Sequence, residues 1–272
     1  SSFARIPAAL FSSEVRVRNT IHIGHKSSDK AQAFTTVLHR WFEQARPYLF
    51  SNLTYSEFSP KPYKGNIPKI NTQKLADAFD RCFANTDQTL DTALRRQATP
   101  HNLYFKKSAY NWLNFCREMP PCYDSRGRRI PHTQFGDIFF ADSESRDLAF
   151  LFLNGKIMLT FWAMAGDDFH VANWMFTDFP LNLKKVSEEH RKKLLPLVDE
   201  LEEVMVQNTS FKLNAGKKVG NYNLAKCRRV TDKSDAIFAE HLGLTEVMPD
   251  IELMYSQIVK TNFSGDEESE DE

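Results

Sequence analysis

The sequence contains none of the short motifs that mark common catalytic and nucleotide-binding sites. Its ten glycines are scattered, and neither GxGxxG nor GxxxxGKS/T occurs, so a glycine-rich phosphate loop is not expected. GxSxG and HExxH are also missing, which argues against a serine hydrolase elbow and a zinc protease helix. The cysteines form no CxxC pair, a pattern that disfavours a zinc site and suggests a reducing compartment. We therefore expect a cytoplasmic protein without a metal. The four cysteines are Cys82, Cys116, Cys122 and Cys227.

Long apolar runs are also missing. The most apolar stretch, residues 148–165, is interrupted by Asn154, Gly155 and Lys156, and no run approaches the roughly 20 residues that a membrane span needs. We interpret it as a buried helix, a turn and a buried strand, and expect no membrane partner and no signal peptide. The hydrophobic content of 42 % and the aromatic content of 12 % are those of a globular chain.

The net charge is zero, with 35 basic and 35 acidic residues, but the charges are unevenly distributed. Six of the last nine residues, 264–272, are acidic, and the remainder holds 35 basic against 29 acidic residues, a net charge of +6. The tail is predicted to be disordered because it repels itself and has nothing to bury. The basic remainder suggests a polyanionic partner.

The hydrophobic spacing predicts an α+β protein with a helical C-terminal third. Helical patterns end at Gly or begin at Ser, Asp or Asn. They cover residues 71–84, 86–97, 142–155, 186–210, 223–244 and 248–263. Strand patterns cover residues 20–25, 52–58, 101–107, 110–116, 135–140 and 156–164, and residues 33–42 begin strand-like before turning helical.

Strands so close to the start of the sequence need partners, and few residues precede them, so the simplest interpretation is a fragment whose preceding part completes a sheet. Residues 59–70 contain three prolines and a glycine and are predicted to be a linker. The predicted organisation is a remnant of a preceding domain at 1–58, a mixed domain at 59–185, a helical region at 186–263 and a disordered acidic tail at 264–272.

The stretch GDDFH, residues 166–170, gathers Asp167, Asp168 and His170. A catalytic or metal site is one interpretation, but adjacent carboxylates on an extended chain diverge. We favour a tight turn between two buried strands, in which Gly166 adopts a positive φ and the aspartates make Asx-type bonds. Such a turn can still display recognition groups, His170 and Asn173 among them. His22 and His25 would face opposite sides of a strand, so a metal site there is not expected.

Three segments resemble adenine-specific DNA methyltransferases, in particular the type IIG restriction-modification class. LFLNGKIMLTFWAMAGDDFHVANWMFTDFPL (151–181) is similar to a stretch of these enzymes, and the opening segment 1–26 resembles the segment that follows their catalytic NPPY motif. KVGNYNLAKCRRVTDKSD (218–235) with HLGL (241–244) resembles their closing segment. The sequence departs from the family in lacking an NPPY motif and a cofactor-binding glycine strand.

The resemblance implies the C-terminal target-recognition region of such an enzyme, which would position duplex DNA for base flipping and methylation by an absent N-terminal methyltransferase domain. This chain would hold no cofactor and would not be catalytic alone, whereas the parent enzyme would use S-adenosylmethionine. Lys and Arg would contact phosphates, and Arg, Asn and Gln would read bases. The predicted DNA-binding residues are Lys106, Lys107, Asn111, Arg126, Arg128, Arg129, His132, Gln134, His170, Asn173, Lys217, Lys218, Arg228 and Arg229.

A second interpretation is a protein-interaction module, or a DNA mimic whose acidic tail imitates phosphates, with no DNA-binding role of its own. An intact enzyme is disfavoured by the missing motifs. The salt dependence of DNA binding separates the DNA-recognition interpretation from the protein-interaction interpretation, because DNA binding by the basic part weakens steeply with added salt.

Overall fold

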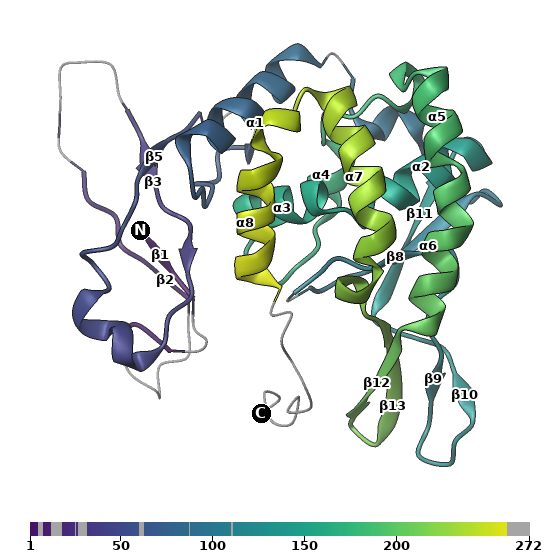
Figure 1. The fold of residues 1–272 in the computed structure, drawn as a ribbon. Helices are drawn as coiled ribbons and strands as arrows, with labels where there is room; N and C mark the ends of the chain where they lie inside the picture. Colours follow the sequence, from purple (N-terminus) through teal and green to yellow (C-terminus); the bar gives the residue numbers. More distant parts are fainter. Residues whose placement is uncertain are drawn as a thin grey trace. The chain divides into compact units, whose positions relative to one another are not determined.

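The computed structural model describes residues 1–4, 8–11, 18–24, 26, 32–59, 63–86, 88–109 and 111–259. It is 44 % helical and 18 % strand, so the predicted α+β class is confirmed. The contacts divide the chain into two compact units (Figure 1). Unit 1 comprises Ser1–Asn85 with Ala163–Ala165, and unit 2 comprises Thr86–Trp162 with Gly166–Glu272. The predicted acidic tail, residues 60–62 of the linker and His25 lie outside the described residues.

Unit 1 is built from two-residue strands around a small core. The order β2-β1-β4 forms one sheet and β3-β5 another. Phe3 and Trp41 are buried with Ala8, Leu10 and Leu49 in one hydrophobic cluster. Of the strand predicted at 20–25, only Thr20 lies in a described strand. The elements are β1 (Ser2–Phe3), β2 (Asn19–Thr20), β3 (Phe34–Thr35), β4 (Leu38–His39), the 3-10 helix η1 (Glu43–Tyr48), β5 (Ser56–Glu57) and α1 (Gln73–Asn85).

Unit 2 is centred on a four-stranded antiparallel sheet with the order β6-β11-β7-β8. The helix predicted at 86–97 is wrong: the segment forms one 3-10 turn and then strand β6, whose Leu94 and Arg95 pair with Phe140 and Phe139. Pairing with a sheet edge outweighs the helical pattern there. The elements are η3 (Leu90–Ala93), β6 (Leu94–Arg95), β7 (Asn102–Lys106), β8 (Phe115–Cys116) and β11 (Phe135–Phe140).

Two consecutive helices, α2 (Ser143–Leu153) and α3 (Lys156–Ala165), occupy the most apolar stretch. The strand predicted at 156–164 is therefore wrong. Every residue of α3 is buried, and a segment that is apolar all round carries no period to separate helix from strand. No single described helix has the length and apolarity to cross a membrane. The two helices together would meet that criterion by length and composition, but they are bent by 66° at their junction.

The C-terminal helices pack on α2 rather than forming a separate layer: α5, α6 and α7 all contact it. The predicted helix 186–210 begins as expected at Ser187, which caps His190, but divides at Pro196 and ends before a strand. The predicted domain boundary at 58/59 falls inside unit 1, and the one at 185/186 falls inside unit 2. The elements are α4 (Asn173–Thr177), η4 (Leu183–Lys185), α5 (Glu188–Leu194), α6 (Pro196–Gln207), η5 (Leu224–Cys227), α7 (Arg228–Leu242), η6 (Thr245–Val247) and α8 (Met248–Ile258).

Two hairpins project together from one end of unit 2 (Figure 1) and join in a sheet of order β10-β9-β13-β12. Ala215 and Gly216 both have positive φ, as a two-residue hairpin turn requires. Gly220 allows the two hairpins to pack closely, because a Cβ at this position would lie 2.3 Å from the Pro121 carbonyl oxygen. We call this four-stranded unit the hairpin sheet. Its strands are β9 (Cys122–Tyr123), β10 (Arg129–Ile130), β12 (Thr209–Asn214) and β13 (Lys217–Tyr222).

Candidate nucleic-acid interface

The hairpin sheet carries an excess of positive charge. Between Cys122 and Ile130 and between Thr209 and Tyr222 there are six cations and a single carboxylate, that of Asp124. The lysines of the second hairpin are exposed, and in the described part of the chain neither Lys212 nor Lys217 forms an ion pair. Most of this excess therefore has no ion-pair partner among the residues that the structure describes. The six cations are Arg126, Arg128, Arg129, Lys212, Lys217 and Lys218.

Side chains alternate between the two faces of β12 and β13. On one face, Lys212 and Asn221 line a groove, and Lys217 lines a smaller hollow beside it. On the other face, the Lys218 ammonium lies 4.6 Å from the centre of the Phe211 ring. The neighbours Lys217 and Lys218, predicted as one DNA-binding pair, thus serve opposite faces of the sheet.

The arginine loop between β9 and β10 is organised by Asp124. Its carboxylate accepts hydrogen bonds from the backbone N–H groups of Arg126 and Arg128, each at 2.9 Å, and from Arg128 Nε at 2.8 Å. These bonds, led by that from the Arg128 backbone, lower the pKa of Asp124. Gly127 supplies the positive φ of the turn. Arg128 is thereby paired, whereas Arg126 and Arg129 are exposed and form no ion pair with any residue that the structure describes.

A polar groove of about 280 Å³ lies between the β12–β13 hairpin and the β7–β8 segment. Lys106 Nζ donates to Asn221 Oδ1 at 3.1 Å, and Asn114 Nδ2 donates to the Asn221 side chain and to the Tyr222 carbonyl oxygen. Of the predicted residues, Lys106, Asn111 and Gln134 line this groove. They converge there although Asn111 and Gln134 lie on different connections of the chain. Lys107 is exposed at the end of β7.

His132 is buried and contacts the hairpin sheet at Gly220. Its Nε2 donates to the Gly220 carbonyl oxygen at 3.0 Å, and its ring packs edge-on against Phe135. Burial lowers the pKa of His132, although the bond to Gly220 opposes that effect. His132 therefore holds β13 in place and is not part of the exposed surface.

The GDDFH stretch is a turn, but between helices α3 and α4 and not between strands. Asp167 Oδ1 accepts from the backbone N–H groups of Phe169 and His170, and its Oδ2 lies 2.5 Å from His170 Nδ1. Asp168, with φ +67°, takes the left-handed conformation predicted for Gly166. Gly166 is extended, and a Cβ there would lie 2.6 Å from the Trp162 carbonyl oxygen. Close packing against the Trp162 carbonyl oxygen therefore explains why residue 166 is glycine.

His170 and Asn173 are both exposed beside this turn. Ser108 and His170 form an isolated β-bridge, and the adjacent Phe169 lines the groove. His170 therefore lies near one end of the groove, while Asn173 opens helix α4.

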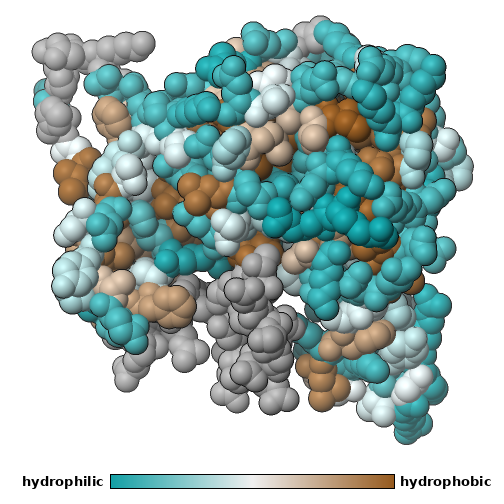
Figure 2. Space-filling model, viewed as in Figure 1, coloured by the Kyte–Doolittle hydropathy of each residue, from teal (hydrophilic) through white to brown (hydrophobic). Residues whose placement is uncertain are grey.

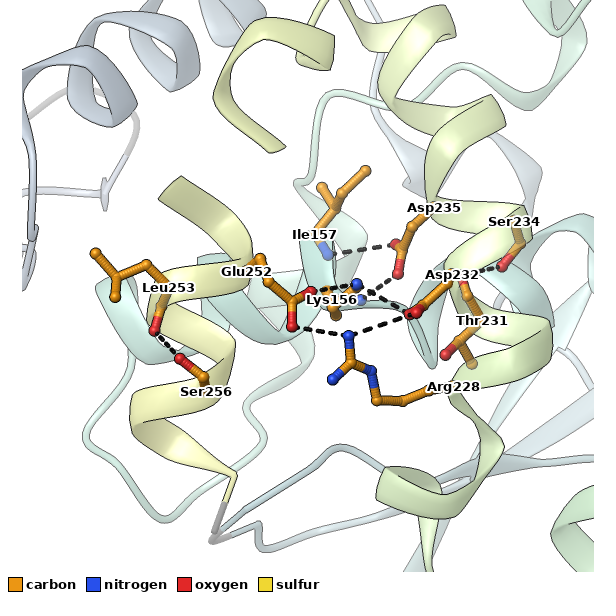
Figure 3. A network of polar contacts seen from close by, with 10 residues as sticks. All are labelled: Lys156, Ile157, Arg228, Thr231, Asp232, Ser234, Asp235, Glu252, Leu253 and Ser256. Atoms are coloured by element: carbon orange, nitrogen blue, oxygen red, sulfur yellow. Dashed lines mark hydrogen bonds and ion pairs between the residues drawn. The ribbon is translucent and has the colours of Figure 1, made fainter. Parts of the chain in front are cut away.

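Arg228 and Arg229 begin α7, which follows β13 after the short η5 helix, and their ion pairs are with helical residues outside the hairpin sheet. Arg228 belongs to a network with Lys156, Asp232 and Glu252 (Figure 3). Its guanidinium also lies over the ring of Tyr255. Arg229 is exposed, and its guanidinium is 3.5 Å from Glu200. The carboxylates in both arrangements reduce the positive charge that each arginine can offer to DNA.

Hydrophobic side chains also reach the surface of the hairpin sheet, where Figure 2 shows brown atoms among hydrophilic ones. Leu213 is 80 % exposed and Phe211 is 39 % exposed, on the face opposite the groove. Val206, at the end of α6, is 56 % exposed. Sequence reasoning missed this hairpin, although its NAGK turn between two short alternating segments was a usable signal.

No family model matches the chain, and neither a curated protein nor a solved structure is significantly similar to it. Among the described residues, no group of three or more His, Cys, Asp or Glu side chains is placed to hold a metal ion.

Proposed function

We propose that the hairpin sheet binds duplex DNA and that the chain is the target-recognition region of an adenine-specific DNA methyltransferase of the type IIG class. The supporting observation is the gathering of six cations and one carboxylate on a projecting sheet. Positive groups that are not neutralised within the protein release counterions from phosphates on binding, which supplies much of the affinity for DNA.

The shape of the sheet supports the same partner. A two-stranded β-ribbon fits the major groove of B-form DNA, which is about 12 Å wide. The β12–β13 hairpin is a ribbon at the edge of the hairpin sheet, where β13 also pairs with β9, and Lys212 and Lys217 lie on one of its faces. Arg126 and Arg129 extend the positive surface onto the neighbouring hairpin. Exposed arginines are suited both to phosphate contact and to bidentate recognition of guanine.

The methyltransferase part of the proposal is carried by the sequence resemblance alone. It assigns base flipping and methyl transfer to a separate domain, so the chain itself would bind no S-adenosylmethionine. Calorimetric titration of the chain with S-adenosylmethionine is expected to give no heat of binding. Saturable binding in the micromolar range would contradict the assignment.

The DNA-binding part is tested by anisotropy titration of a labelled duplex at several salt concentrations between about 50 and 200 mM. Lys212→Glu/Lys217→Glu is expected to weaken binding by at least about tenfold and to reduce the dependence on salt. The matched control is Lys184→Glu/Lys192→Glu, which changes two exposed lysines near and within α5 and alters the net charge equally. If both variants lose affinity alike, net charge explains the binding and the hairpin sheet is not the interface.

A protein partner is the second candidate, and the exposed Phe211 and Leu213 favour it. These side chains lie on the face opposite the groove. Phe211→Ser/Leu213→Ser would leave the salt-dependent DNA titration unchanged if the apolar face serves another purpose. A loss of DNA binding as large as that of the lysine variant would place both faces in one interface.

A further inference from the structure

The groove between the β12–β13 hairpin and the β7–β8 segment has the composition of a small-ligand site. Six of its fourteen lining residues carry amide side chains, two are lysines and none is a carboxylate. Two aromatic residues, Trp112 and Phe169, complete the lining. Amides present paired donors and acceptors, lysines favour an anion and aromatic rings favour a planar partner. The six amide residues are Asn111, Asn114, Gln134, Asn214, Asn221 and Asn223.

Hydrogen bonds fix how the amides face one another. Both donors of Asn114 are used, at 3.3 Å from Asn221 Oδ1 and at 3.0 Å from the Tyr222 carbonyl oxygen. A flipped amide would set its oxygen against two acceptors, so the orientation of Asn114 is determined. Asn114 is 2 % exposed. Its Oδ1, like that of Asn223, is buried with no hydrogen-bond partner among the residues that the structure describes.

Buried acceptors without partners are rare in folded proteins, and they indicate a bound water, an ion or a ligand. Both of these acceptors belong to residues that line the same groove. These two oxygens are sealed from solvent, whereas the more accessible amides of the lining, Asn111, Gln134 and Asn214, can pair with N–H or O–H donors of a ligand. The two lysines, Lys106 and Lys212, favour a ligand that also carries negative charge. An amino-substituted base linked to a phosphate combines these groups.

We propose that this groove binds a single nucleotide unit whose base carries an exocyclic amino group, with its phosphate toward Lys106 and Lys212. The volume of about 280 Å³ lies just below the range of small-molecule sites, roughly 300–1,000 Å³. Asn and Gln side chains pair with adenine through its amino group and the adjacent ring nitrogen. A base pair inside a stacked duplex cannot enter a concave groove, whereas a free or unpaired nucleotide can. The site shares Lys212 with the surface proposed for duplex DNA, but it would take an unpaired nucleotide and not a base pair.

The test is isothermal titration of the whole chain with AMP, UMP and ribose 5-phosphate. AMP is expected to bind at least about fivefold more tightly than UMP, because uracil lacks the amino donor, and ribose 5-phosphate is expected to bind more weakly than either. Asn111→Leu/Gln134→Leu removes two lining amides whose side chains make no hydrogen bond to any residue that the structure describes. This variant is expected to abolish the preference for AMP over UMP. Gln97→Leu/Gln257→Leu, two exposed amides outside the groove, is the matched control.

The source of the nucleotide is separated by a second titration, with duplexes that carry one unpaired adenosine or one unpaired thymidine. Tighter binding of the adenosine bulge identifies a nucleotide within a strand, and preference for AMP without a bulge effect identifies a free nucleotide. Equal binding of AMP, UMP and ribose 5-phosphate together with equal binding of the two bulges overturns the inference. That result leaves the affinity for fully paired DNA unaffected, so the two proposals fail independently.

Discussion

Unit 2 holds two groups of cations that differ in their surroundings. In the network of Figure 3, Lys156 and Arg228 share Asp232 and Glu252, and Lys156 is only 7 % exposed. On the hairpin sheet there are six cations and one carboxylate, which pairs with Arg128. A buried cation needs a partner to offset its lost hydration, whereas an exposed one does not. The cations of the first group therefore have partners inside the protein, whereas those of the second are the ones that we propose to contact DNA.

The network also serves the backbone of α3. Asp235, at its buried end, accepts a hydrogen bond from Lys156 N at 2.8 Å. It thereby caps a helix whose own N-cap residue is Gly155, which has no side chain to accept. Burial raises the pKa of Asp235 to about 7, although Lys156 opposes this effect.

The largest expected effect is on stability, from Asp235→Leu. It leaves the first N–H groups of α3 without an acceptor, which is expected to lower the free energy of unfolding by about 1–3 kcal/mol. Urea denaturation measures this change, and the salt dependence of DNA binding should stay as in the wild type. A variant of normal stability with weakened DNA binding would reverse the contrast between the two cation groups.

The pH dependence follows from the raised pKa of Asp235. Because the folded protein binds this proton more tightly than the unfolded chain, the contribution to stability is fully present below the unfolded pKa near 3.8. It is lost as pH rises toward about 7. The free energy of unfolding of the wild type is thus expected to fall more between pH 5 and 7 than that of Asp235→Asn. Parallel pH profiles for the two proteins would contradict this.

These two cation groups also show what the sequence could and could not predict. The helix at α2 with its Asp142 cap, the α1 stripe and the strand β11 follow from local spacing. The partners of Arg228 come from residue 232 on the same helix and residue 252 on the next, and only the latter separation hid its pairing. The groove was beyond prediction because its lining is assembled from four separate segments, 106–114, 134, 169 and 210–223.

The next effect is on DNA binding and separates the arginines of the loop. Arg126→Ala and Arg129→Ala are each expected to reduce the salt slope by about one unit if each contacts a phosphate. Arg128→Ala should change it less, because Arg128 is already paired with Asp124 at 2.8 Å. Anisotropy titrations over a salt series give the slopes. Equal losses for all three would show that Asp124 does not withhold Arg128 from DNA.

A smaller effect in the opposite direction is expected for Asp124→Asn. An asparagine can still accept the backbone bonds of the loop but no longer neutralises Arg128, so affinity for duplex DNA is expected to rise by about twofold to threefold at low salt. Because the pKa of Asp124 is lowered from 3.8, the wild-type carboxylate stays ionised above pH 5 and should add no pH dependence there. Unchanged or weaker binding by Asp124→Asn would remove the distinction between paired and unpaired arginines.

The smallest effects are expected in the turn 166–170, which belongs to neither cation group. Asp167 pairs with His170 at the surface, where both side chains are at least half exposed, so solvent screening limits the value of the pair. Asp167→Asn keeps an oxygen for the backbone bonds and is expected to change stability by less than about 1 kcal/mol. The pKa of Asp167 is lowered, since its bonds to His170 and Phe169 outweigh its desolvation. Its contribution is therefore present above pH 3.8 and lost as pH falls through the folded pKa.

Asp168→Asn is expected to be equally mild, because asparagine tolerates the left-handed conformation at φ +67°. Asp168→Val is the informative contrast, since a β-branched residue resists positive φ. Thermal denaturation of the three variants at pH 7 compares them directly. If Asp167→Asn or Asp168→Asn proved as destabilising as Asp168→Val, the carboxylates would be doing more than shaping a turn, and the metal or catalytic interpretation of GDDFH would return.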